Sequence, residues 1–383
     1  MFVACAHNMR PTFDRVDALN AARKTFQYPG TYEMHRGGVL ERPVIAYETW
    51  GELSPKRDNA IVIFTGLSPS AHASSSIADS APGWWEEMVG PSRAIDTRKF
   101  FVVCVNSLGS CFGSTGPASV NPDTGERYRL TFPVLTLEDV AVTGHALIQH
   151  LGIERLFAVI GPSMGGMTSL AYAALYPGAY SRLVLISTGP RSLPFATALR
   201  SLQRELIRKD PDWRDGNYEP GHEPVQGMRL ARKLGMITYR SPEEWELRFG
   251  RERVPEERKS GDSFALDFEI ESYLEAHANK FIGQFDPNCY LYLSRASDLF
   301  DIAEHGGSVP AGLARIVVDK ALVIGVASDI LFPIHQQREL ADGIAAAGND
   351  VKFVQLDSIN GHDSFLVDMD RFRPVIHKFL TDA

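Results

Sequence analysis

The fold expected for this chain is decided by the segment IGPSMGGM, residues 160–167. It follows the apolar run LFAVI (156–160) and precedes a helical pattern at residues 168–175, so its serine lies between a strand and a helix. A Gly-x-Ser-x-Gly motif in that context places the serine on a sharp, strained turn, and its glycines leave room for the neighbouring strand and helix. The hydroxyl of Ser163 is therefore predicted to be a catalytic nucleophile.

Short apolar runs alternate with longer amphipathic stretches on both sides of this turn. Continuous apolar runs suit parallel strands that are covered on both faces, and the alternation with helices indicates a mostly parallel, doubly wound sheet. Together with the serine turn, this pattern predicts an α/β-hydrolase fold. The expected strands are AIVIF (60–64), FFVVCV (100–105), LFAVI (156–160), LVLI (183–186) and ALVIGV (321–326), and helices are expected at 137–151 and 168–175.

The alternation stops after residue 190, and charged segments with helical patterns follow, among them SLQRELIRKDPDW and SPEEWELRF. We expect an α/β core formed by residues 1–190 and 312–383. Residues 191–311 are predicted to be a helical insertion, because both of its ends join sheet segments. A lid over the sheet is the favoured arrangement, and an independent helical domain is the alternative.

Composition excludes several classes of protein. The 383 residues are 44% hydrophobic and 22% charged, which is typical of a globular protein and not of a disordered one. The net charge of -8 argues against nucleic acid as the main partner. The four cysteines include no CxxC pair, so neither a zinc site nor a disulfide framework is predicted, and a reducing compartment is expected. We predict no metal and no bound cofactor.

The N-terminal sequence MFVACAHNMRPTFDR has the pattern of neither a signal peptide nor an anchor. No apolar run approaches the roughly 18 residues that a membrane helix needs. The sequence therefore predicts a cytoplasmic protein without a membrane partner.

An activated serine requires a histidine base and an acid that orients it, and in this fold the chain order is serine, acid, histidine. Asp329 directly follows the strand ALVIGV, at the carboxyl end where this fold collects its catalytic groups. Asp319 precedes the same strand and lies at its opposite end. Asp329 is therefore the predicted acid.

The predicted base is His362, in the segment NGHDSFL after the apolar run VKFVQL. The preceding glycine permits a tight loop, and the order along the chain is the expected one. His335, at the expected start of a helix, and His305, in a Gly-rich part of the insertion, are the alternatives.

Two backbone N–H groups are expected to stabilise the oxyanion of an acyl-transfer reaction. One is that of Met164, at the start of the helix after the nucleophile. The other is that of Leu67, in the segment TGLSPSAHA that follows the first expected strand. An ordinary Gly/Ser/Pro turn is the alternative interpretation of this segment.

From about residue 37 to 380, the chain resembles the homoserine O-acyltransferase family of α/β hydrolases. The segments that carry the resemblance include AYETWGEL, PGWWEEMVGPSRAIDT, FFVVCVNSLGSCFGSTGPASVNP, GPSMGGM, SDILFP and GHDSFL. The resemblance implies the same three catalytic residues. It also implies that Arg232 binds the carboxylate of an amino-acid acceptor, that Asp363 binds its ammonium group and that Tyr239 assists.

The loop Gly66-Leu67-Ser68-Pro69 resembles that of the subgroup that transfers a succinyl group to L-serine, whereas homoserine acetyltransferases usually carry an ALTG-like segment there. This resemblance implies a succinyl-CoA co-substrate, an acyl-enzyme on Ser163 and a role in cysteine biosynthesis. A homoserine O-acetyltransferase or O-succinyltransferase of methionine biosynthesis, with acetyl-CoA as a possible donor, is the alternative. A plain serine esterase is a further alternative, and a homodimer is expected from the resemblance alone.

Overall fold

The structure, a computed structural model, describes residues 22–382. Three features named above lie outside the described residues. They are the beginning of the expected core, the N-terminal stretch that has the pattern of neither a signal peptide nor an anchor, and Cys5.

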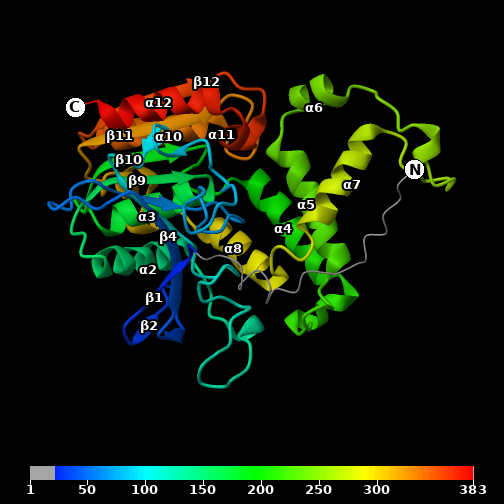
Figure 1. The fold of residues 1–383 in the computed structure, drawn as a ribbon, viewed down its shortest axis with the longest axis horizontal. Coiled ribbons are helices and arrows are strands. Elements are labelled where there is room, and N and C mark those ends of the chain that lie inside the picture. The colour runs from blue at the N-terminus through cyan, green and yellow to red at the C-terminus, as the bar shows by residue number, and fades with distance from the viewer. Residues whose placement is uncertain (1–21, 383) are drawn as a thin grey trace.

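A sheet of eight strands forms the centre of the molecule, in the order β1-β4-β8-β5-β9-β10-β11-β12 (Figure 1). β4 pairs antiparallel with β1 and β8, and the other neighbours pair parallel. Each apolar run predicted to be a strand lies in this sheet, which confirms the predicted fold class. The strands are β1 (Lys24–Gln27), β4 (Val44–Trp50), β5 (Ala60–Phe64), β8 (Phe101–Val105), β9 (Leu156–Pro162), β10 (Tyr180–Ile186), β11 (Lys320–Val326) and β12 (Asp350–Leu356).

Helices cover both faces of the sheet, as its continuous apolar strands require. α2 (Leu137–His150), α3 (Met164–Leu175) and α10 (Ile334–Ala346) pack in one core cluster, and α12 (Met369–Thr381) packs in the other. α2 begins with a capping box, in which Thr136 and Asp139 satisfy each other's backbone N–H groups. Two small sheets lie outside the main one: β2 (Thr31–Glu33) with β3 (Val39–Glu41), and β6 (Val89–Gly90) with β7 (Ile95–Asp96).

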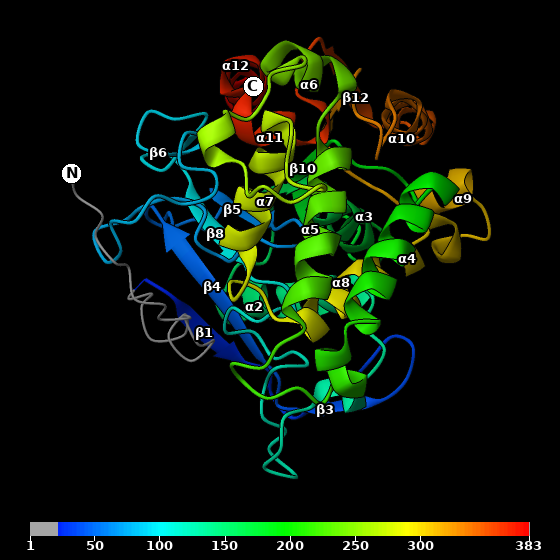
Figure 2. The same cartoon turned by 90° about the vertical axis from the view of Figure 1, so that its right-hand side faces the viewer.

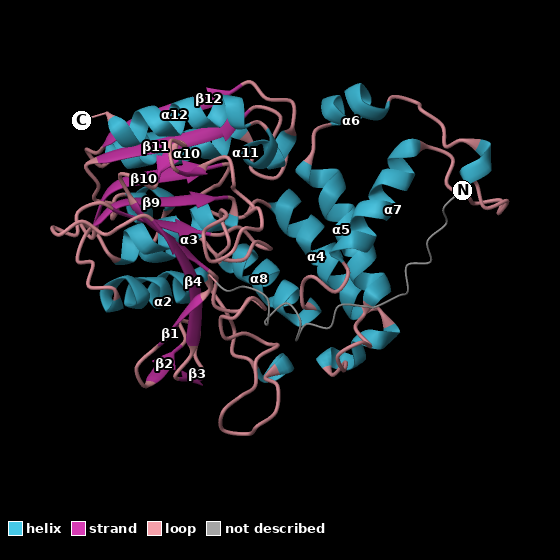
Figure 3. Cartoon of the chain, in the orientation of Figure 1, coloured by secondary structure: helices cyan, strands magenta, loops and turns pink. Residues whose placement is uncertain are grey.

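Between β10 and β11 the chain forms a group of helices beside the sheet (Figures 1 and 3). Seen from that side, α4 and α5 run next to each other in front of the sheet (Figure 2), and the two helices are in contact. The group consists of α4 (Pro194–Arg208), α5 (Val225–Tyr239), α6 (Pro242–Phe249), α7 (Glu269–Phe281), α8 (Pro287–Leu299) and α9 (Val309–Leu313).

Short turns complete the chain. They are the 3₁₀ helices η1 (Arg129–Thr131), η2 (Pro211–Gly216), η3 (Glu256–Arg258), η4 (Ile302–His305) and η5 (Gly361–Asp363), and the single turn α11 (Ser364–Val367). α5 contacts η5, so the helical group touches the core next to the predicted catalytic histidine. Within residues 22–382, no helix is both long and apolar enough to cross a membrane.

Candidate active site

Ser163 lies on a strained turn between β9 and α3. Its φ of 55° and ψ of -124° are rare for a residue with a side chain. Two contacts hold this conformation: the Ser163 N–H donates to the carbonyl oxygen of Ile186 (2.9 Å), and the Thr188 hydroxyl donates to the Ser163 carbonyl oxygen (2.8 Å). The adjacent strand β10 and the residues after it therefore fix the nucleophile's backbone.

The glycines of the motif are required by close backbone approaches. A Cβ atom on Gly161 would lie 2.1 Å from the carbonyl oxygen of Gly165, and one on Gly165 would lie 2.1 Å from the carbonyl oxygen of Phe64. A Cβ on Gly166 would lie 2.6 Å from the Thr188 side chain. Residues with side chains at these positions would push the turn away from the sheet. Pro162 is accommodated as the last residue of β9.

Ser163, His362 and Asp329 form a chain of hydrogen bonds. The Ser163 hydroxyl is 2.8 Å from His362 Nε2, and His362 Nδ1 is 2.7 Å from Asp329 Oδ2. The other carboxylate oxygen, Oδ1, accepts the backbone N–H groups of Leu331 and Phe332, both at 2.9 Å. An ionised Asp329 only accepts, so His362 carries its proton on Nδ1 and presents the Nε2 lone pair to the serine.

The surroundings of His362 favour a proton on the imidazole. Burial on its own lowers the pKa of His362, but the negative charge and hydrogen bond of Asp329, and the charge of Asp363, outweigh it and raise the pKa above its ordinary value. Arg200 opposes this increase. The rings of Phe332 and Phe365 pack against the imidazole, with centroids 5.3 and 5.7 Å away. The ring is therefore held by both charge and packing.

The alternative acid and bases lie elsewhere. His305 Nε2 is 3.1 Å from a carboxylate oxygen of Glu138, and His335 is in the first turn of α10. Asp319 is an exposed residue that forms an ion pair with Arg155. Among the described residues, none of these three lines the pocket in which Ser163 lies.

The pocket at Ser163 is enclosed by residues from the core and from the helical group. Leu67, Met164 and Tyr239, all predicted site residues, are among them. Gly66, Ser68 and Pro69 are not among the described residues that line it, so Leu67 is the one residue of the predicted specificity loop in this lining. The full lining is Leu67, Ser163, Met164, Leu199, Arg200, Gln203, Thr238, Tyr239, Tyr290, Ser297, Leu331, Phe332 and His362.

The sequence did not reveal the part of this lining that α4 and α8 contribute. Arg200 and Gln203 come from α4, and Tyr290 and Ser297 from α8. Gln203 is 4% exposed, which is unusual for a glutamine, but α4 carries so many polar residues that its inward face cannot be chosen from sequence alone.

Arg232 and Asp363 line a neighbouring pocket and not the one at Ser163. Tyr239 is next to both pockets: its ring lies 5.9 Å from the Arg232 guanidinium and 6.1 Å from the His362 ring. Arg232 also stacks on Phe281 at 4.5 Å. Its buried Nε makes no hydrogen bond within the described part of the chain.

Asp363 already has a cationic partner. Its Oδ2 is 3.4 Å from Nε of Arg240, the residue that follows α5. Burial raises the pKa of Asp363 above its ordinary value, and the positive charges of Arg240, His362 and Arg232 reduce this increase. An ammonium ion bound here would therefore share the carboxylate with Arg240.

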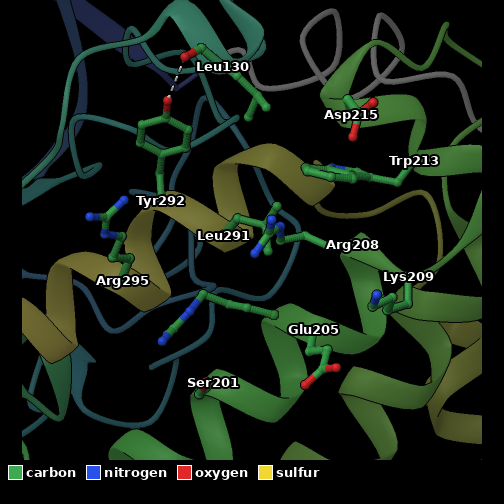
Figure 4. A pocket seen from close by; sticks show the side chains of 11 residues that line it. Leu130, Ser201, Glu205, Arg208, Lys209, Trp213, Asp215, Leu291, Tyr292 and Arg295 are labelled. Carbon is green, nitrogen blue, oxygen red and sulfur yellow. Dashed lines mark hydrogen bonds between the residues drawn. The ribbon is translucent and has the colours of Figure 1, made fainter.

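A larger cavity of about 920 Å³ opens on another side of α4 and α8 (Figure 4). Its lining includes Trp213 and the cationic side chains of Arg208, Lys209 and Arg295. The Tyr292 hydroxyl beside them lies 2.7 Å from the carbonyl oxygen of Phe132 and 3.2 Å from that of Leu130. Neither the nucleophile nor the histidine lines this cavity. In residues 22–382, no three His, Cys, Asp or Glu side chains are grouped so that they could hold a metal ion.

Comparison with known proteins agrees with this geometry. Residues 59–368 match the family described as alpha/beta hydrolase fold. A serine O-succinyltransferase of Litchfieldella anticariensis is 55% identical over 363 residues, covering 94% of this chain and 99% of that protein. The crystal structure of homoserine O-acetyltransferase from Bacillus anthracis is similar, with a TM-score of 0.85, 30% identity and coverage of 94% of this chain and 97% of that one.

Esterase E22 has a similar structure too, with a TM-score of 0.84, 30% identity and coverage of 94% of this chain and 99% of that one. The fold is thus shared by transferases and an esterase, whereas the high identity over nearly full length is to a transferase. These matches confirm the resemblance that the sequence segments indicated: the chain belongs to the alpha/beta hydrolase fold family and, within it, to the family of the serine O-succinyltransferases.

Proposed function

We propose that this enzyme transfers a succinyl group from succinyl-CoA to the hydroxyl of L-serine through an acyl-enzyme on Ser163. The observation that carries the acyl-transfer chemistry is the chain of hydrogen bonds Ser163–His362–Asp329, with distances of 2.8 and 2.7 Å. The choice of donor and acceptor is supported by the serine O-succinyltransferases that are more than half identical to this chain.

In the first half of the proposed reaction, His362 Nε2 takes the proton of the Ser163 hydroxyl as its oxygen attacks the thioester carbon. The N–H groups of Leu67 and Met164 stabilise the negative charge on the carbonyl oxygen. The tetrahedral intermediate collapses, the C–S bond breaks, and His362 returns the proton to the leaving thiolate. The succinyl group is now an ester of Ser163.

In the second half, His362 takes the proton of the acceptor hydroxyl as its oxygen attacks the ester carbon. The C–O bond to Ser163 then breaks, and His362 returns the proton to the Ser163 oxygen. We propose that Arg232 and Asp363 bind the carboxylate and ammonium of the amino acid, and that Tyr239 lies between them and the catalytic pocket. The helices of residues 191–311 would act as a lid that excludes water, because water attacking the acyl-enzyme would hydrolyse it.

The decisive experiment is a matrix of two donors, succinyl-CoA and acetyl-CoA, against two acceptors, L-serine and L-homoserine. We expect kcat/KM to be highest for succinyl-CoA with L-serine. A preference for homoserine with either donor would instead support a homoserine acyltransferase of methionine biosynthesis. Rapid hydrolysis of p-nitrophenyl esters without transfer to an amino acid would support an esterase.

The acyl-enzyme has its own test. Wild-type protein incubated with succinyl-CoA and no acceptor should gain one succinyl group by intact-protein mass spectrometry, and Ser163→Ala should gain none. Turnover of Ser163→Ala should fall by about 10⁶-fold, which is typical of the loss of a catalytic serine. Full turnover in this variant would rule out the assignment.

The proposal also assigns the enzyme to cysteine biosynthesis, because an O-acylated serine carries a good leaving group for replacement by sulfur. The homodimer and the cytoplasmic location remain predictions from the resemblance and from the cysteine usage. Equilibrium sedimentation of the purified protein would test the first.

A further inference from the structure

Arg200 stands out among the residues that line the pocket of Ser163. It is the one lysine or arginine among the described lining residues, and its side chain is 11% exposed. Its positive charge lowers the pKa of His362, which places the guanidinium within electrostatic reach of the reaction centre. The reaction as proposed leaves this charge without a role: the oxyanion has backbone donors, and the acceptor's carboxylate has Arg232.

The guanidinium of Arg200 is held in a fixed position. Its Nε donates to Asp298 Oδ1 (2.7 Å), and its Nη2 donates to the hydroxyl of Ser192 (2.6 Å). Ser192 in turn donates to the carbonyl oxygen of Ser297 (2.7 Å), which itself lines the pocket. Nη1 makes no hydrogen bond within residues 22–382, so a donor remains available on a preorganised cation.

The charges around Arg200 do not cancel. Arg204, one helical turn further along α4, donates to the other oxygen of Asp298 (2.7 Å), so two guanidinium groups share a single carboxylate and one positive charge is left unbalanced. The side chain of Asp298 is 8% exposed, and little solvent screens the remaining positive charge. A buried cation in this state is stabilised by an anionic ligand.

We infer that Arg200 binds the distal carboxylate of the acyl group carried by Ser163, and so selects a dicarboxylic acyl donor over a simple one. The inference rests on the proposed function and identifies the subsite of that same pocket that would receive the second carboxylate. The methylenes of such an acyl group would contact Leu67, Leu199 and Leu331, which are apolar members of the lining. An acetyl group offers nothing for Arg200 to bind.

The two arginines near the site would then have separate ligands. Arg200 faces the pocket of the nucleophile and would bind the donor, while Arg232 lines the neighbouring pocket with Asp363 and would bind the acceptor. This division predicts that substitutions of Arg200 change donor selectivity, whereas substitutions of Arg232 change the KM of the acceptor.

The test compares donors in Arg200→Gln. We expect kcat/KM for succinyl-CoA to fall about 100-fold or more, as is typical when one partner of a buried charge pair is removed. With acetyl-CoA, measured at a pH high enough for His362 to be neutral in both proteins, kcat/KM should change less than about threefold. Arg200→Lys should recover part of the succinyl-CoA activity, because it keeps the charge and loses the planar fork.

Arg204→Gln is the matched control. Arg204 shares Asp298 but lines the outer cavity of Figure 4, so its loss should leave the ratio between the two donors unchanged. An unchanged donor ratio in Arg200→Gln would overturn the inference, as would a raised KM for serine as its main effect. Wild-type enzyme that transfers no succinyl group would overturn the proposed function itself, and this inference with it, whatever the variants do.

Discussion

The pocket at Ser163 has two walls of different character. One wall, which we call the sheet wall, consists of loops that follow strands and carries Ser163, His362 and the residues after Asp329. The other, the helix wall, consists of α4, the end of α5 and α8, and carries Arg200. The polar groups of the catalytic chain on the sheet wall are bonded to one another or to backbone N–H groups.

On the helix wall and beside it, by contrast, two partly buried arginines keep N–H groups that make no hydrogen bond within the described residues: Nη1 of Arg200 and Nε of Arg232. Under the proposed function, this difference separates the groups that perform the reaction from the groups that recognise the substrate. Groups that perform the reaction must be oriented before the substrate arrives, so they are satisfied internally. Groups that recognise a charged substrate must retain bonding capacity for it.

Asp329→Asn, a change in the sheet wall, should reduce kcat more than any other substitution in this comparison. The asparagine oxygen would keep the N–H groups of Leu331 and Phe332, and its NH₂ would then face His362 Nδ1. The imidazole would have to accept there and carry its proton on Nε2, which prevents it from acting as a base. We expect kcat to fall about 10⁴-fold without loss of fold.

Asp319→Asn is the matched control for this change. Asp319 lies next to the opposite end of β11, is exposed and forms an ion pair with Arg155. An exposed pair contributes little, so kcat and the melting temperature should stay close to wild type. A loss below about tenfold in Asp329→Asn would show that the histidine is oriented by other groups.

The sheet wall was predictable from sequence because its geometry follows from topology. The carboxyl ends of parallel strands meet at one edge, so residues directly after β9 and β11 must lie close together, although Ser163 and Asp329 are far apart in the chain. The strained turn was marked by its glycines. The antiparallel strands β1 and β4 were not predicted, because Lys24, Glu48 and similar residues interrupt their apolar pattern.

The helix wall could not be predicted in the same way. α4 carries Arg200, Arg204 and Arg208, and sequence alone does not show which of them faces the nucleophile. Their orientation depends on Asp298, about a hundred residues further along the chain, and on how α8 packs against α4. Arg232 was predicted to bind the acceptor only through resemblance to a family, and without that resemblance a solvated helix face would have been expected.

Arg232→Gln tests whether recognition is separate from chemistry. We expect the KM for L-serine to rise about 100-fold, because a bidentate partner for the acceptor's carboxylate is lost. The rate at which the acyl-enzyme forms from succinyl-CoA should stay within about twofold of wild type, since that step needs the sheet wall and the donor alone. Steady-state kinetics and rapid-quench mass spectrometry measure the two quantities.

Arg229→Gln controls for a general disturbance of α5. Arg229 is on the same helix and forms an ion pair with Glu275, away from the catalytic pocket. Its loss should change neither the KM nor the acylation rate. If Arg232→Gln slowed acylation as strongly as it weakened serine binding, recognition and chemistry would not be separable.

The smallest expected effect is a shift in the pH profile, and it connects the two walls. His362 must be neutral to act as a base, and its pKa is raised above the ordinary histidine value. We therefore expect the pH profile of kcat/KM to have an acid limb, a range below the pKa of His362 in which kcat/KM falls by about tenfold per pH unit. The groups that face the imidazole act in opposite directions: Asp329 and Asp363 favour its protonated form, and Arg200 disfavours it.

Two variants should therefore move this acid limb in opposite directions. Arg200→Gln removes a cation, stabilises the imidazolium and shifts the limb to higher pH, whereas Asp363→Asn removes an anion and shifts it to lower pH. The pH profiles are measured with acetyl-CoA, because its acyl group has no carboxylate that Arg200 could bind. Shifts in the same direction would mean that the helix wall acts on His362 through structure and not through charge; opposite shifts would show that the recognition residues also set the working pH of the base.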